Sequence, residues 1–256
     1  MKVVILAGGL GTRISEESHI VPKPMIKIGG KPILWHIMQY YASYGQKEFI
    51  ILAGYKQEVI KDYFNNYYLH NSDTTFHLKD QTSKLLKSYS DDWIVTVLDT
   101  GLHTNTAGRL LYAKEHLIKE DSFLLTYGDG LSDVKLDDLI TSHKRSKADV
   151  TLTAIRPKGR FGLLDIDENN MIKSFKEKSD NDLNWINGGF MVVNPSIYQH
   201  IRSETDVLET DVLPVVAKNN GLYSFKHYGF WQAMDTLRDK ELLDNLISND
   251  KTPWIR

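Results

Sequence analysis

The sequence contains no cysteine, which excludes disulfide bonds, thiolate catalysis and metal sites built from cysteine. It lacks an apolar run long enough to span a bilayer, and its first residues lack the basic, apolar and small-residue succession of a signal peptide. A formal charge of −2 gives no electrostatic reason to expect nucleic acid or an anionic membrane as a partner. These absences predict a soluble, cytoplasmic protein that binds neither nucleic acid nor membrane.

Short apolar runs alternate with stretches of helical periodicity through the first 156 residues. Strands are expected at 2–7, 48–54, 93–100, 122–129 and 150–156, and helices at 32–45, 57–70, 108–117 and 134–145. Such alternation is typical of parallel βαβ units with right-handed crossovers. We therefore predict an α/β fold with a doubly wound, mostly parallel, Rossmann-like sheet.

The alternation ends in the C-terminal half, where antiparallel additions are expected. Residues 161–178 indicate a hairpin turning at 168–170, residues 186–193 a strand running into a helix from Pro195, and residues 223–229 a late strand. No linker rich in proline, glycine or serine divides the chain, so we predict a single domain over residues 1–256.

Residues 71–92 are polar, poorly periodic and too long for a simple connection. A surface loop is the preferred interpretation. An excursion used in oligomer contacts is the alternative.

The motif GGLGTR (8–13) directly follows the first predicted strand, at the edge where doubly wound sheets bind ligands. The dinucleotide fingerprint would require a third glycine at the position of Ile14, and Pro22 and Pro24 oppose the helix that should follow. The P-loop would require Gly-Lys-Ser/Thr, which no glycine of this region supplies. Neither of these two glycine signatures explains the turn.

The remaining features of this turn are a glycine-rich backbone, Thr12 and Arg13, with Lys23 and Lys27 soon after. Consecutive backbone N–H groups bind anions, and a guanidinium binds phosphate oxygens in a bidentate manner. A tight turn with solvated cations is the alternative, but the combination favours phosphate binding.

Two distant aspartates could complete a phosphate site with a metal ion. Asp129 ends a buried predicted strand, and Asp235 precedes the last predicted helix. Mg²⁺ is commonly held by one or two carboxylates together with substrate phosphates and water. The alternatives are that Asp129 only begins a turn and that Asp235 only caps the helix from Thr236.

Motifs along nearly the whole chain occur in an order that resembles the sugar-phosphate nucleotidyltransferases, and among them the glucose-1-phosphate cytidylyltransferases. They are LAGGLGTR (6–13), VPKPM (21–25), IGGKPILWHIM (28–38), DTG (99–101), GRL (108–110), TYGDGLSD (126–133), GRFGLLDI (159–166), FKEK (175–178), INGGF (186–190) and FWQAMDTLRDK (230–240). Thymidylyl- and uridylyl-transferring relatives share the first block but continue differently where this chain has VPKPMIKIGGKP.

This resemblance implies a Mg²⁺-dependent enzyme that transfers CMP from CTP to a sugar 1-phosphate, with release of pyrophosphate. The expected acceptor is α-D-glucose 1-phosphate, giving CDP-glucose for the deoxysugars of surface polysaccharide; another sugar or polyol phosphate is the alternative. A phosphate oxygen is already an anionic nucleophile, so no general base is required. The resemblance also implies a homo-oligomer. The nucleotide-binding core is expected in residues 1–156, and sugar-phosphate binding, with a part that could serve oligomerisation, in residues 157–256.

The resemblance further implies a role for particular residues. The catalytic residues would be Arg13, Lys23 and Asp129, and the metal ligands Asp129 and Asp235. The nucleotide would be bound by Leu6, Ala7, Gly8, Gly9, Leu10, Gly11, Thr12, Arg13, Lys23, Thr104, Thr106, Arg109 and Gly128. The sugar phosphate would be bound by Glu177, Lys178, Asn187 and Gly188.

The chain departs from the family pattern at two positions. Ala107 replaces a glycine of the usual TGGR loop, and Ser179 replaces the proline that follows the acceptor-binding lysine. Two other classes of function are possible for such a sequence: a non-catalytic nucleotide-sugar sensor and a nicotinamide oxidoreductase. The presence of Arg13, Asp129 and Asp235 opposes the sensor, and the missing third glycine opposes the oxidoreductase.

Overall fold

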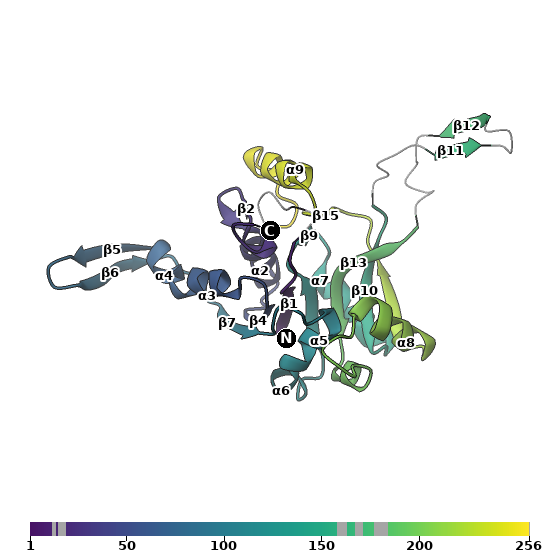
Figure 1. Cartoon of the computed structure of the whole chain (residues 1–256), viewed down its shortest axis with the longest axis horizontal. Coiled ribbons are helices and arrows are strands. Elements are labelled where there is room, and N and C mark those ends of the chain that lie inside the picture. The colour runs from purple at the N-terminus through teal and green to yellow at the C-terminus, as the bar shows by residue number, and fades with distance from the viewer. Residues whose placement is uncertain (12–13, 15–18, 158–162, 167–170, 177–183, 256) are drawn as a thin grey trace.

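A seven-stranded sheet forms the centre of the computed structural model, which describes residues 1–11, 14, 19–157, 163–166, 171–176 and 184–255 (Figure 1). The strand order is β14-β10-β13-β8-β1-β4-β7. These strands are β1 (Val3–Ala7), β4 (Glu48–Ala53), β7 (Ile94–Asp99), β8 (Phe123–Tyr127), β10 (Val150–Ile155), β13 (Ile186–Val193) and β14 (Leu222–Lys226).

The sheet is mostly parallel, as predicted. Strand β1 pairs in parallel with β4 and β8, β4 pairs in parallel with β7, and β10 pairs in parallel with β14. Strand β13 pairs antiparallel with both β8 and β10. From β1 the chain continues to β4 on one side and later returns to β8 on the other, so a topological switch point lies between β1 and β8.

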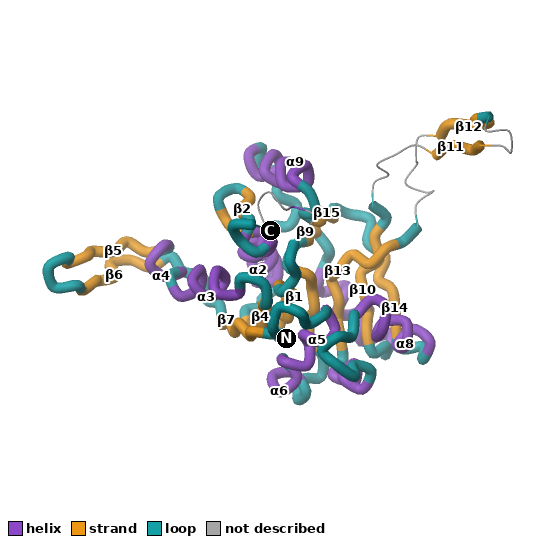
Figure 2. Tube along the Cα trace, in the orientation of Figure 1, coloured by secondary structure: helices purple, strands orange, loops and turns teal. Residues whose placement is uncertain are grey.

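Helices cover both faces of the sheet (Figure 2). They are α2 (Ile33–Ser43), α3 (Gln57–Asn65), α4 (Tyr67–His70), α5 (Thr106–Tyr112), α6 (Lys114–Leu117), α7 (Leu136–Ser146), α8 (Leu213–Lys218) and α9 (Leu237–Ser248). Two of the predicted helices are each divided in two, at Asn66 and at Ala113. Lys23–Met25 and Pro195–Gln199 form 3₁₀ turns, and Leu208–Val212 forms a π-helical turn.

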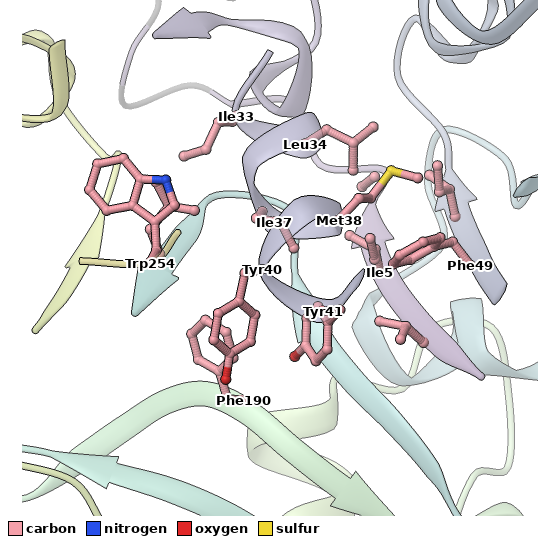
Figure 3. Close-up of a cluster of buried hydrophobic side chains, with 14 of the residues drawn as sticks. Ile5, Ile33, Leu34, Ile37, Met38, Tyr40, Tyr41, Phe49, Phe190 and Trp254 are labelled. Atoms are coloured by element: carbon pink, nitrogen blue, oxygen red, sulfur yellow. The ribbon is translucent and has the colours of Figure 1, made fainter. Parts of the chain in front are cut away.

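The apolar core lies in two layers because successive side chains of a strand point to opposite faces. Val3 and Ile5 of β1 join the layer under α2, whereas Val4 and Leu6 join the layer under α5 and α8. Figure 3 shows part of the first layer, in which Met38 of α2 lies near Ile5 and Phe49. Ile33, Leu34 and Ile37 of α2 belong to the same cluster. All are essentially inaccessible to solvent, and burial of each such side chain contributes roughly 1.5–3 kcal/mol.

The polar stretch 71–92 is a β-hairpin, so the surface-loop interpretation was wrong. Strand β5 (Ser72–His77) pairs antiparallel with β6 (Thr82–Ser88), and the hairpin extends away from the sheet beyond α4 (Figure 1). Neither face of the hairpin packs on the core, so its strands do not need the alternation of apolar and polar residues by which a half-buried strand is predicted. They are recognised only by their backbone pairing.

The other expected hairpin is confirmed in its strands. Strand β11 (Leu163–Ile166) pairs antiparallel with β12 (Ile172–Lys176); its expected turn at 168–170 lies outside the described residues. Four short strands complete the fold in two antiparallel pairs. They are β2 (Lys27–Ile28) with β3 (Lys31–Pro32), and β9 (Gly130–Ser132) with β15 (Trp231–Ala233).

Candidate active site

A pocket of about 420 Å³ opens at the carboxyl ends of β1 and β8, at the switch point of the sheet. Its lining comes from segments far apart in the chain. The lining residues are Leu6, Ala7, Gly8, Gly9, Gly11, Lys23, Pro24, Thr104, Asn105, Thr106, Arg109, Tyr127, Gly128, Asp129 and Asp235. This is where ligands bind in open α/β sheets.

Lys23 joins the two aspartates in this pocket. Its Nζ lies 2.5 Å from Asp129 Oδ2 and 2.8 Å from Asp235 Oδ1. The Lys23 side chain is only 12% exposed, and those of Asp129 and Asp235 are 28% and 33% exposed. Burial lowers the pKa of Lys23, but the charges and hydrogen bonds of the two carboxylates outweigh it, so this pKa lies above its ordinary value.

The short β9–β15 pair brings the two aspartates together. Asp129 directly precedes β9, Asp235 follows β15 by two residues, and the register pairs Gly130 with Ala233. The Met234 N–H donates to the carbonyl of Asp129 at 2.9 Å. Two residues more than 100 positions apart therefore present their carboxylates to one point.

Asp235 is not the cap of the last helix. Thr236 is the N-cap of α9 and forms a capping box with Asp239: its hydroxyl accepts from the Asp239 N–H, and the Asp239 carboxylate accepts from the Thr236 N–H. The Asp235 carboxylate lies against Lys23 instead. The capping alternative weighed from the sequence is therefore wrong.

The donor set at this point suits a divalent ion that is shared with a substrate. Two carboxylates converge there, and the described part of the chain contains no group of three or more histidine, cysteine, aspartate or glutamate side chains that could hold a metal. Mg²⁺ accepts one or two carboxylates when phosphate oxygens and water complete its octahedron. Asp129 and Asp235 therefore fit Mg²⁺ bound with a polyphosphate.

The glycine turn is held in place by Arg109, which is 4% exposed. Its guanidinium donates to the carbonyls of Gly8 at 3.0 Å and Gly101 at 2.9 Å, and to the hydroxyl of Thr100. A Cβ on Gly8 would lie 2.1 Å from Arg109 Nη1, so only glycine fits there. Burial lowers the pKa of Arg109. Arg109 is expected to bind the nucleotide. In this structure its guanidinium forms these three hydrogen bonds with backbone carbonyls and with Thr100.

Other glycines let the backbone approach closely. A Cβ on Gly128 would lie 2.9 Å from Pro24 Cγ and 3.0 Å from the carbonyl of Leu6. Gly11 has a φ of 65°, in the left-handed region that glycine favours. Leu10, expected at the nucleotide, is 51% exposed and does not line the pocket.

Thr106, the first residue of α5, forms hydrogen bonds with the side chain of Glu209 and with the backbone of buried Leu208. Its hydroxyl donates to Glu209 Oε2 at 2.9 Å and accepts from the Leu208 N–H at 2.8 Å. Thr104 is buried in the same loop. Both lie in the pocket wall as expected for the nucleotide loop.

Asn187 and Gly188, expected at the sugar phosphate, lie at the start of β13 behind the pocket wall. Asn187 donates to the hydroxyl of Tyr127 at 3.3 Å, and Tyr127 does line the pocket. Gly188 accepts from Trp231 Nε1 at 2.7 Å, and a Cβ there would lie 3.0 Å from Ile155. Four expected site residues, Thr12, Arg13, Glu177 and Lys178, lie outside the described residues.

Sequence reasoning missed Tyr127 and Glu209 as site residues. The place of Tyr127 at the carboxyl end of β8, just before Gly128 and Asp129, could have identified it. Glu209 is 82 residues further along and in no motif, and its side chain contacts Tyr127. Only the fold reveals this contact.

A glycine cradle, a cation and two carboxylates lie together at the switch point of an α/β sheet, and their chemistry would suit a metal-bound nucleoside polyphosphate. The nucleotidyl transferase family model matches residues 2–239. The chain belongs to the nucleotidyl transferase family.

Individual relatives narrow this assignment. The chain is 49% identical to a glucose-1-phosphate cytidylyltransferase of Salmonella typhi over 254 residues, covering 99% of this chain and 98% of the relative. It is 43% identical to a probable glucose-1-phosphate cytidylyltransferase of Bacillus subtilis over 257 residues, covering 99% of each. The crystal structure of HddC from Yersinia pseudotuberculosis has the same fold, with a TM-score of 0.70, 24% identity, and coverage of 96% of this chain and 99% of that one. The resemblance drawn from the motifs is confirmed.

No helix within the described ranges has both the length and the apolar character needed to cross a membrane.

Proposed function

We propose that this protein transfers CMP from CTP to α-D-glucose 1-phosphate, giving CDP-glucose and pyrophosphate for the deoxysugars of surface polysaccharide. The observation that carries the proposal is the convergence of Lys23, Asp129 and Asp235 beside the glycine turn, in a chain 49% identical to a glucose-1-phosphate cytidylyltransferase. The cytoplasm is the proposed compartment.

In the proposed reaction, an anionic oxygen of the sugar phosphate attacks the α-phosphorus of CTP. The bond from this phosphorus to the oxygen that bridges to the β-phosphate breaks, and pyrophosphate leaves with the electron pair. Bound Mg²⁺, held by Asp129 and Asp235, would neutralise charge on the α-phosphate and the leaving group. The task of the protein is in-line positioning and charge neutralisation.

The roles of single residues follow from this chemistry. Lys23 would bind the β- and γ-phosphates together with Arg13. The backbone of residues 6–11 would surround the nucleotide, and Thr104 and Thr106 lie on the same pocket wall. Glu177 and Lys178 would bind the sugar hydroxyls and the acceptor phosphate.

Pyrophosphate release across a panel of nucleotides and phosphates tests the proposal. CTP with glucose 1-phosphate is expected to give the highest kcat/KM, and Asp129→Asn, assayed in parallel, serves as the inactive control. Absence of turnover with glucose 1-phosphate would refute the proposed acceptor. Turnover with another sugar or polyol phosphate would instead establish the alternative, for which Ser179, in place of the usual proline, is the reason.

We also propose that the chain forms a homo-oligomer through the β5–β6 hairpin. Phe76, Leu78, Leu85 and Leu86 expose 58%, 86%, 44% and 62% of their surface on this projecting element, and apolar exposure of this kind marks contact surfaces. Light scattering after size-exclusion chromatography is expected to give a multiple of the 29.4 kDa chain mass. Leu78→Lys with Leu86→Lys is expected to lower that mass; an unchanged mass would exclude this hairpin as the contact.

A further inference from the structure

A chain of hydrogen bonds crosses the pocket wall from the nucleotide loop to the start of β13. Thr106 donates to one oxygen of Glu209 at 2.9 Å, and the hydroxyl of Tyr127 donates to the other. The Tyr127 hydroxyl also accepts from Asn187 Nδ2 at 3.3 Å. Glu209 thus connects Thr106, assigned to the nucleotide, through Tyr127 to Asn187, assigned to the sugar phosphate.

Glu209 fixes the direction of these hydrogen bonds. An ionised carboxylate only accepts, so both hydroxyls must donate to it. Tyr127 then has its oxygen lone pair left for Asn187, whose own Oδ1 accepts from the Gly189 N–H at 2.9 Å. The orientation of the Asn187 amide is therefore set by the Tyr127 hydroxyl at its Nδ2 and by the Gly189 N–H at its Oδ1. The two hydrogen bonds to Glu209 are charge-assisted and are therefore the strongest of these hydrogen bonds.

The backbone around Glu209 is held firmly against α5. The N–H groups of Ala107 and Gly108 donate to the carbonyl of Asp206, and the Asn105 N–H donates to that of Glu204. A Cβ on Gly108 would lie 2.1 Å from the Glu204 carbonyl oxygen, so only glycine permits this contact. Glu209 itself lies in a π-helical turn, a conformation frequent at functional sites.

We propose that Glu209 is a positioning residue that couples the two substrate sites, by orienting Thr106 on the nucleotide side and Tyr127 with Asn187 on the acceptor side. This inference rests on the proposed function. Glu209 acts through these residues and does not itself line the pocket.

Glu209→Gln is the decisive variant because it keeps the shape of the side chain and removes one acceptor. An amide has a single acceptor oxygen, so only one of Thr106 and Tyr127 can keep its present hydrogen bond. Glu204→Gln is the matched control: Glu204 accepts from the hydroxyl of Tyr112 at 2.8 Å on the same segment, and neither residue lines the pocket.

Steady-state kinetics with CTP and glucose 1-phosphate would measure the coupling. Loss of a charge-assisted hydrogen bond is expected to lower kcat/KM about tenfold for each substrate in Glu209→Gln, and less than about twofold in Glu204→Gln. Thr106→Val is expected to raise the KM of CTP alone, and Tyr127→Phe that of the sugar phosphate alone. Added to Glu209→Gln, either change is expected to have a much smaller effect than in the wild type.

Two outcomes would overturn the proposal. One is kinetics of Glu209→Gln within twofold of the wild type for both substrates. The other is a lowered melting temperature with unchanged KM values, which indicates a structural role only. Turnover by the wild type is recorded first, so a failure of the proposed function is seen separately. If the wild type shows no turnover, calorimetry would compare the binding of CTP to Glu209→Gln and to Glu204→Gln, and the difference between the two variants would test the positioning role of Glu209.

Discussion

Replacement of Lys23 by methionine is expected to open the pocket to a divalent ion in the absence of nucleotide. In the present structure the ammonium lies between Asp129 and Asp235, at 2.5 and 2.8 Å from their oxygens. A metal ion that binds these carboxylates must therefore displace it. Methionine keeps most of the apolar stem and removes the competing charge.

The size of the effect follows from the two contacts that the ion must replace. Each hydrogen bond to a charged group contributes about 1.5–3 kcal/mol. The departing ammonium regains water, and if that offsets half of the loss, about 2 kcal/mol remains, equivalent to roughly a 30-fold change in affinity. Lys23→Met should thus bind Mn²⁺, used as a probe, roughly 30-fold more tightly than the wild type does without nucleotide.

Titration with Mn²⁺ followed by electron paramagnetic resonance measures this affinity directly, without turnover. Lys27→Met is the control, since Lys27 is exposed and lies only four residues away. A second readout is thermal: the unpaired carboxylates of Lys23→Met should lower its melting temperature, and Mn²⁺ should restore it. Equal Mn²⁺ affinity in Lys23→Met, Lys27→Met and the wild type would refute the reasoning.

Three further predictions concern catalysis, packing and pH. Asp129→Asn is expected to abolish nearly all turnover while leaving the fold intact; near-normal turnover at saturating Mg²⁺ would contradict its role as a ligand. Gly8→Ala should lower the free energy of unfolding by about 2 kcal/mol, because its Cβ would lie 2.1 Å from buried Arg109. Gly9→Ala should leave this free energy unchanged, because a Cβ there has nothing within 4 Å. Equal urea midpoints for the two variants would show that the guanidinium can move. His36 donates to the Ile28 carbonyl and accepts from Trp254, and burial lowers its pKa below 6.5. Because the unfolded chain then binds the proton more readily, the contribution of His36 to the free energy of unfolding should be full above about pH 7 and fall as pH drops through 6.5. Measured by urea unfolding, the free energy of His36→Gln should lack this part of the pH dependence. An identical pH dependence in the variant and the wild type would exclude His36 as its source.

The sequence was sufficient for most of the sheet, since buried strands such as β1, β4 and β8 are continuous apolar runs ended by glycine or polar residues. It was insufficient for the β5–β6 hairpin, whose strands pack on no core and so carry no pattern. Helix ends also differed from the prediction: helix breaks occur at Asn66, whose side chain donates to the Asp62 carbonyl, and at Ala113.

The same division holds for the site. The amino-acid types and their spacing predicted a phosphate site at the glycine turn and its cations, because backbone N–H groups and charged side chains bind phosphate wherever a strand delivers them. The family came from the resemblance of motifs along the chain. The amino-acid types and their spacing also placed Asp129 at a strand end, which is a local property. They left Asp235 undecided between ligand and cap, since both choices have the same local pattern.

Tertiary structure decided which of these groups meet. The β9–β15 pairing brings Asp235 to Asp129 and Lys23, Thr236 takes the capping role, and Glu209 reaches Tyr127. Arg109 directs donors to backbone carbonyls beside the pocket. The contacts of Glu209 with Tyr127 and of Lys23 with Asp235 join residues about 80 and more than 200 positions apart, so they follow from the strand order of the whole sheet and not from any local stretch of sequence.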